Sequence, residues 1–134
     1  MATKRTGAAV TVERRLMAWW MSGTGMRPGS SFVWHPPTNV YETVDGLVVQ
    51  VEVAGLSADD FRIVLRPGRL TVSGVRRPVP SLGNSTACLQ VEIPGGAFRS
   101  EVDLPWPVDS SAVRAAYRHG FIFVELSRSG DGDA

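Results

Sequence analysis

The feature that most constrains the fold is a two-residue hydrophobic period that begins after residue 37. Apolar and polar side chains alternate in five runs, at residues 47–53, 61–66, 70–73, 89–93 and 98–104. Successive side chains of a strand point to opposite faces of a sheet, so this period predicts strands with one buried face. A sixth run, residues 121–126, is apolar except at Glu125, which predicts a strand covered on both faces.

Turn-forming residues separate these runs at short spacing. They are Asp45-Gly46, Pro67-Gly68, Gly95-Gly96, Pro105-Trp106-Pro107 and His119-Gly120. Such short connections suit antiparallel strands, because a parallel crossover needs a dozen or more residues. The His119-Gly120 pair is similar to an Asn-Gly hairpin turn, with the histidine in the left-handed region. The sequence therefore predicts an all-β fold, an immunoglobulin-like antiparallel β-sandwich of about eight strands.

Residues 1–37 differ from the rest in composition. Five basic residues stand against the single acidic residue, Glu13, and the segment is rich in bulky apolar side chains. Residues 10–21 contain no glycine or proline and can form a helix, whereas Pro36-Pro37 favours an extended backbone. We predict a partly helical or flexible N-terminal arm over residues 1–37, a β-domain over 38–128 and a short tail over 129–134.

Composition excludes several classes of partner and compartment. A formal net charge of +1 on 134 residues leaves no basic stripe for nucleic acid. The single cysteine, Cys88, cannot form an internal disulfide and suits a reducing, cytoplasmic compartment, where we interpret it as a passive strand residue. No apolar run approaches the roughly 20 residues that span a bilayer.

Motifs that carry catalysis are missing from the sequence. It contains no glycine-rich phosphate loop, no metal-binding spacing of Cys or His and no nucleophile elbow. His35 and His119 lie far apart, and Asp59-Asp60 is typical of a turn or helix cap. We predict no catalytic residue, no metal site and no cofactor; an enzyme with an unrecognised site is the alternative.

Four segments together resemble the small heat-shock proteins, the family of the α-crystallin (Hsp20) domain, over about residues 37–128. They are VYETVDGLVVQVEVAGLSADDFRIVL, GRLTVSGVRR, GAFRSEVDLPWPVD and AAYRHGFIFVELSR. The resemblance implies an ATP-independent chaperone, a holdase that binds unfolding client proteins and prevents their aggregation. The alternative is a co-chaperone-like or scaffold module of the same fold that docks on folded partners.

The resemblance also implies where copies of the chain contact one another. It identifies a strand that is exchanged with a second copy to form a homodimer or a larger homo-oligomer: Cys88, Leu89, Gln90, Val91, Glu92 and Ile93. It further implies a groove between residues 61–66 and 113–118, with Ile63, Leu65, Val113 and Ala115 as its residues. From the residues alone, the alternative is that residues 88–93 form an ordinary internal strand and are not exchanged.

Two positions depart from the family pattern. Ser100 occupies the place of the arginine in the family's Phe-x-Arg segment, and Arg99 falls on the opposite face of the strand. Residues 127–134, SRSGDGDA, contain no Ile-x-Ile or Val-x-Ile motif of the kind that fills a neighbour's groove in this family. We therefore expect the groove to be free for a segment of another protein.

The N-terminal arm supplies the apolar surface that client binding requires. We predict that clients bind Leu16, Met17, Trp19, Trp20, Met21, Phe32 and Trp34. Methionine and aromatic side chains adapt to many sequences, and each buried aromatic contributes roughly 1.5–3 kcal/mol. The alternatives are packing of these residues on the sandwich or inside an oligomer, and membrane-surface binding, which the shortness of the segment disfavours.

Overall fold

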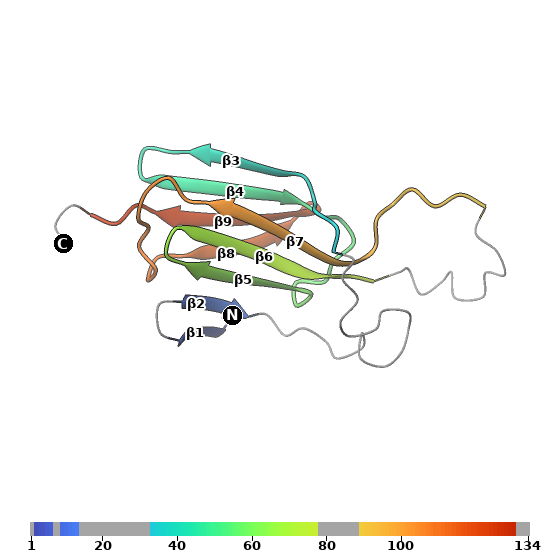
Figure 1. Cartoon of the computed structure of the whole chain (residues 1–134), viewed down its shortest axis with the longest axis horizontal. Helices are drawn as coiled ribbons and strands as arrows, with labels where there is room; N and C mark the ends of the chain where they lie inside the picture. The colour runs from blue at the N-terminus through green and yellow to red at the C-terminus, as the bar shows by residue number, and fades with distance from the viewer. Residues whose placement is uncertain (1, 7–8, 14–32, 78–88, 131–134) are drawn as a thin grey trace.

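The computed structural model describes residues 2–6, 9–13, 33–77 and 89–130, and these form two antiparallel sheets (Figure 1). Sheet A contains, in spatial order, β1 (Ala2–Thr6), β2 (Ala9–Glu13), β5 (Phe61–Arg66), β6 (Arg69–Arg76) and β7 (Gly96–Asp103). Sheet B contains β3 (Thr38–Glu42), β4 (Gly46–Glu52), β9 (Phe121–Ser127) and β8 (Arg114–Arg118). The predicted all-β sandwich is confirmed.

The core lies between the two sheets and follows the period of two in the sequence. In β4, β5 and β9, the buried side chains alternate with partly or fully exposed ones. The buried hydrophobic residues are Leu47, Val49, Val51, Val53, Phe61, Ile63, Leu65, Leu70, Val72, Phe98, Val102, Ile122, Val124 and Leu126. In β4 and β5 the alternation thus identified which face is buried, whereas the sequence of β9 does not alternate.

Two of the predicted hairpin turns form as the sequence indicates. Arg118 pairs with Phe121, so only two residues join β8 to β9, and both have positive φ, 54° at His119 and 81° at Gly120. Pro67-Gly68 joins β5 to β6 in the same way, with φ of 78° at the glycine. A side chain of ordinary size is disfavoured at such φ values, so the turn residues fix the register of these hairpins.

Gly46 has a different role from the one its Asp45-Gly46 pair suggested. It is the first residue of β4, it is buried, and its φ is not positive. A β-carbon at this position would overlap the carbonyl oxygen of Leu126 in β9. Gly74 in β6 is required for the same reason, because a β-carbon there would overlap the carbonyl oxygen of Asp60 and the ring of Phe98.

The structure corrects the prediction for the start of the arm. Residues 9–13 form a strand, so the helix expected from Val10 does not begin there, and residues 14–21 lie outside the described part of the chain. β2 pairs on one side with β1 and on the other with β5. A strand partner distant in the sequence therefore overrides the local preference, as tertiary context commonly does.

Two strand predictions also change. β9 is covered on one face only, because Phe121 and Phe123 lie half-buried on the outer face of sheet B, 5.9 Å apart between ring centroids. Residues 89–93 form no strand within the chain. In the ranges described, no helix is long and apolar enough to span a membrane.

Candidate interaction surfaces

The exchange segment, which we define as residues 89–93, extends away from the sandwich (Figure 1, yellow). Its three apolar side chains are almost fully solvated, with exposed fractions of 98% at Leu89, 73% at Val91 and 79% at Ile93. The polar residues between them interact with each other, since Gln90 Nε2 donates to Glu92 Oε2 at 2.7 Å. An alternating segment with this exposure has the pattern of a strand without a sheet. Cys88 lies outside the described residues.

Arg76 fixes the position of the backbone directly after the exchange segment. Its guanidinium donates through Nε to the carbonyl oxygen of Pro94 at 3.1 Å, and through Nη2 to the same oxygen. The guanidinium carbon lies 4.3 Å from the ring centroid of Trp34, a cation–π contact. Because Arg76 is the last residue of β6, this strand holds the backbone at the point where the exchange segment meets the domain.

The outer edge of β3 is the second exposed surface. β3 is an edge strand of sheet B and pairs only with β4 among the described elements. Val40 and Tyr41 expose 45% and 51% of their surfaces there, and Val44 in the following turn is fully exposed. An edge of this kind presents unpaired backbone N–H and C=O groups to which a further strand can add.

The predicted groove residues fall into two environments. Ile63 and Leu65 of β5 are core residues with exposed fractions of 0% and 4%. Val113 and Ala115, from the other sheet, are partly buried against the same core. Leu65 lines a pocket beside the β5–β6 turn, whereas Val113 and Ala115 line a different one. The outer edge of β5 pairs with β2 and is not free, contrary to the sequence-based expectation.

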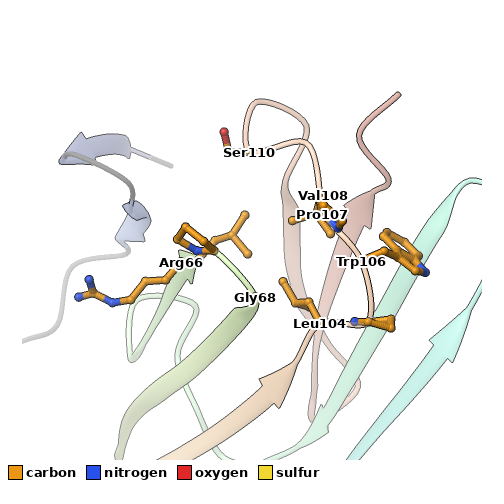
Figure 2. A pocket seen from close by; sticks show the side chains of 10 residues that line it. Arg66, Gly68, Leu104, Trp106, Pro107, Val108 and Ser110 are labelled. Carbon is orange, nitrogen blue, oxygen red and sulfur yellow. The ribbon is translucent and has the colours of Figure 1, made fainter. Parts of the chain in front are cut away.

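A pocket opens beside Leu65, between the β5–β6 turn and the loop that follows β7 (Figure 2). Leu104 N donates to the carbonyl oxygen of Gly68 at 2.9 Å, which joins the two sides. Trp106 is fixed on the loop side: its Nε1 donates to Glu42 Oε1 at 3.3 Å, and the guanidinium carbon of Arg128 lies 5.2 Å from its ring. The sequence marked this loop only as a turn.

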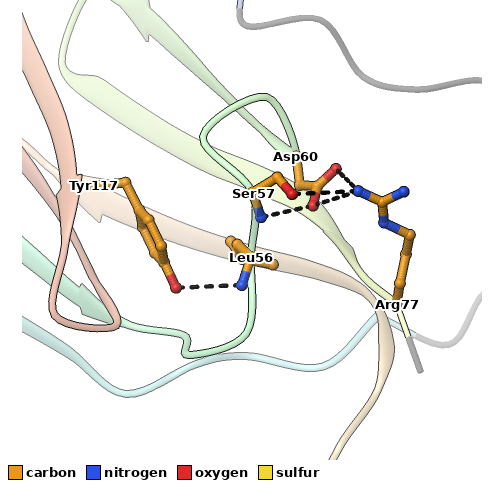
Figure 3. A network of polar contacts seen from close by, with 5 residues as sticks. All are labelled: Leu56, Ser57, Asp60, Arg77 and Tyr117. Carbon is orange, nitrogen blue, oxygen red and sulfur yellow. Dashed lines mark hydrogen bonds and ion pairs between the residues drawn. The ribbon is translucent and has the colours of Figure 1, made fainter. Parts of the chain in front are cut away.

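A buried carboxylate organises the loop between β4 and β5 (Figure 3). Asp60 is 3% exposed, and its Oδ2 accepts a hydrogen bond from Ser57 N at 2.9 Å. Arg77 Nη2 lies 3.1 Å from both carboxylate oxygens. The sequence indicated a turn or cap role for Asp59-Asp60, which the bond to Ser57 N confirms, but it did not indicate the ion pair.

The same loop is tied to β8 by one tyrosine (Figure 3). Tyr117 Oη donates to the carbonyl oxygen of Val53 at 2.9 Å and accepts from Leu56 N at 3.3 Å. The loop between the sheets is thus held from both sides, by Tyr117 and by Arg77.

Of the predicted client-binding residues, only Trp34 lies in the described part of the chain. Its ring is half-buried 5.7 Å from the ring of Phe98, and its Nε1 donates to the carbonyl oxygen of Gly96 at 3.4 Å. Trp34 thus packs on β7. The other residues of that set are outside the described ranges.

Ser100, the position that departs from the family pattern, points into the sandwich. Its side chain is 6% exposed, and its Oγ lies 2.6 Å from Oγ1 of Thr38, so the two hydroxyls share a hydrogen bond between the sheets. Arg99 is exposed on the opposite face. The serine therefore connects β7 to β3 through a short neutral contact.

The two histidines do not form a joint site. His119 occupies its hairpin turn, and Nδ1 of His35 donates to the carbonyl oxygen of Arg99 at 2.8 Å. Within the described ranges, no group of His, Cys, Asp and Glu residues is placed to hold a metal ion. The surfaces that remain are strand edges and apolar patches, which suit binding to polypeptides.

Comparisons with known proteins agree with this geometry. The model of the Hsp20/alpha crystallin family matches residues 39–133. Small heat shock protein C2 of Rickettsia felis is 24% identical over 97 residues, which are 72% of this chain and 62% of that relative, so the chain spans less than two thirds of the relative's length.

Solved structures show the same fold. HSP18.5 from E. histolytica superposes with a TM-score of 0.64 at 24% identity, covering 76% of this chain and 95% of that one. Heat shock protein 16.0 from Schizosaccharomyces pombe gives a TM-score of 0.64 at 22% identity, covering 78% of this chain and 74% of that one. At this level of identity, the likeness concerns the fold.

Proposed function

Because the chain belongs to the Hsp20/alpha crystallin family, we propose that it is an ATP-independent holdase that binds unfolding proteins in the cytoplasm and prevents their aggregation. The observation that carries the proposal is the exchange segment, in which three largely exposed apolar side chains alternate with polar ones. A monomer gains nothing from such exposure, whereas an assembling chaperone uses it to join two domains.

The homodimer in this proposal forms when the exchange segment of one copy adds to the edge of β3 in the other. The segment and β3 are each five residues long, so one can pair along the whole of the other. Val40 and Tyr41 then offer apolar surface to the incoming strand. By symmetry the contact forms twice in a dimer, which covers the outer edge of β3 in each copy.

Client binding in this proposal belongs to the arm. Leu16, Met17, Trp19, Trp20 and Met21 form a compact apolar cluster in the sequence. Contact with an unfolding chain at several of these positions gives reversible capture without a fixed sequence requirement. The domain then has the role of a scaffold that keeps the arm in solution.

Replacing these five arm residues together by serine tests client binding. We expect the serine variant to lose most of its protection of a heat-labile enzyme, measured as light scattering during heating, because the apolar contacts are gone while the domain is unchanged. The matched control, Arg14→Ser with Arg15→Ser, alters the same arm but keeps its apolar residues, and it should protect as the wild type does.

Three results would contradict parts of this proposal. Full protection by the five-residue variant would show that clients bind outside these arm residues. Failure of the wild type at molar excess would exclude holdase activity. A stable one-to-one complex with a natively folded partner, without protection of clients, would favour the scaffold function.

A further inference from the structure

The exchange segment is joined to β7 through a short stretch of permissive backbone. Pro94 follows the segment, and Gly95 lies between it and Gly96, the first residue of β7. Gly96 has a φ of 83°, which residues other than glycine rarely adopt, and a β-carbon on Gly95 would meet nothing within 4 Å. By itself, backbone of this kind lets the segment leave the domain in many directions.

Two side chains restrain this stretch. Arg76 stands opposite Gly96 in the register of β6 and β7. Its guanidinium extends beyond that pair and donates through two nitrogens to the carbonyl oxygen of Pro94. Trp34 Nε1 donates to the carbonyl oxygen of Gly96 at 3.4 Å. The contacts therefore fall on both sides of Gly95 and limit the directions that the segment can take.

The two restraining side chains also hold each other. The guanidinium carbon of Arg76 lies 4.3 Å from the ring centroid of Trp34. Arg76 Nη1 donates to the carbonyl oxygen of Ala54, in the loop after β4, at 3.5 Å. The backbone of Trp34 is bonded to β7 through the carbonyl oxygen of Ala97 at 3.1 Å and through Arg99 N at 3.0 Å. The arm, the loop after β4 and the base of the exchange segment are therefore joined at one guanidinium.

We propose that Trp34 and Arg76 form a clamp that positions the exchange segment for contact with a second copy, so that a residue of the N-terminal arm controls the affinity of the homodimer. The inference rests on the homodimer of the proposed function. Pre-organising a binding segment lowers the conformational entropy that association must remove. Neither residue belongs to the segment that makes the contact, so both are positioning residues.

Arg76→Ala tests the clamp through the dimer. We expect its dissociation constant, measured by analytical ultracentrifugation, to rise at least about tenfold, because backbone is released in each of the two symmetric contacts. Arg76→Lys keeps the charge but loses the planar fork that donates twice to one oxygen, so most of the effect should remain. The matched control is Arg114→Ala, an exposed arginine of β8 at the opposite edge of sheet B from β3, which should stay within about threefold of the wild type. An unchanged dissociation constant in Arg76→Ala would overturn the proposal.

A double variant tests whether the two residues act as a unit. We expect Trp34→Ala alone to weaken the dimer, and the combination with Arg76→Ala to be within about threefold of Arg76→Ala alone. Trp34→Phe keeps a ring against Phe98 but loses Nε1, so it gives the same cycle in a protein whose packing is retained. Effects that multiply in the double variants would show that the two side chains act separately and would overturn the clamp.

A spin label measures the restraint on the segment without the dimer. Cys88 is the only cysteine, so Cys88→Ser with Ile93→Cys gives one labelling site directly before Pro94. Ile93 is 79% exposed, so the label displaces no packing. At concentrations where ultracentrifugation detects only monomer, we expect Arg76→Ala to narrow the electron paramagnetic resonance spectrum through greater mobility, and Arg114→Ala to leave it unchanged. Equal label mobility in all three proteins would contradict the clamp.

Protection of a heated client separates this inference from the proposed function. If the wild type protects clients but Arg76→Ala changes neither the dimer affinity nor the label mobility, the clamp is excluded while the holdase function stands. If Arg76→Ala changes both but the wild type protects no client, the holdase function fails and the clamp stands. A wild type that forms no dimer would overturn the inference.

Discussion

Replacement of Val91 and Ile93 by serine is expected to convert the proposed homodimer into monomers, with a dissociation constant raised by at least about 10⁴-fold, because the contact forms twice and four apolar side chains leave it. Burying each of these side chains contributes about 1.5–3 kcal/mol, and each 1.4 kcal/mol changes an affinity tenfold. Both side chains are largely exposed in the single chain, so their loss removes no packing from the domain itself. Analytical ultracentrifugation across a concentration series measures the shift.

Gln90→Ser is the matched control for this experiment. Gln90 lies in the same segment but alternates with the apolar residues, so its substitution should leave the dissociation constant within about threefold of the wild type. An unchanged dissociation constant in the Val91/Ile93 variant would show that the exchange segment does not form the dimer contact. A variant that is monomeric only because it is unfolded would show itself by loss of the β-sheet circular dichroism spectrum.

Asp60→Ala is expected to lower the free energy of unfolding by about 2–4 kcal/mol. The substitution leaves Ser57 N–H without its acceptor, which costs about 1–3 kcal/mol for a buried donor. It also removes the ion-pair partner Asp60 from Arg77, whose side chain is 34% exposed, so solvent offsets part of the cost of breaking the pair. Urea denaturation followed by fluorescence gives the difference.

The neighbouring carboxylate provides the control. Asp59 is exposed, and Asp59→Ala should change the free energy of unfolding by no more than about 0.5 kcal/mol. A loss of less than about 1 kcal/mol in the Asp60 variant would mean that the carboxylate contributes little to holding the loop between β4 and β5, contrary to the role given to it here.

The strands of the sandwich were predictable because their signal is local. In β4 and β5, each residue's face follows from its place in the alternation, and burial of Val49 and Ile63 needs no knowledge of the partner strand. The sequence of β9 is apolar at almost every position, so it predicted the strand but not that only one face is covered. The turn at His119-Gly120 was predictable for the same reason, since positive φ values select their residues locally.

What the sequence did not reveal depends on partners that lie far away along the chain. Residues 10–13, Val-Thr-Val-Glu, are β-branched at three positions, but nothing in the sequence indicates that their partner is β5. Residues 89–93 have the pattern of a strand and form none, because no edge within the described chain receives them. The alternation predicts the strand, but not where its partner is.

The interaction sites were predictable to a smaller extent. The resemblance to the family pointed to the exchange segment, and its exposed side chains agree with that role, which stays a prediction until the dimer is measured. The groove at Ile63 and Leu65 was expected to be free, and β2 lies along its edge instead. The burial of the Asp60 side chain was indicated only indirectly, by the Ser-x-x-Asp spacing just before the buried Phe61.

The most direct test of holdase activity is size-exclusion chromatography of a heated mixture of this protein and a thermally unstable client, without any nucleotide. We expect the client to elute in a soluble complex with the protein at high apparent mass, whereas client heated alone is lost as precipitate. If the client precipitates equally in both samples while the protein elutes unchanged, the chain does not hold unfolding proteins.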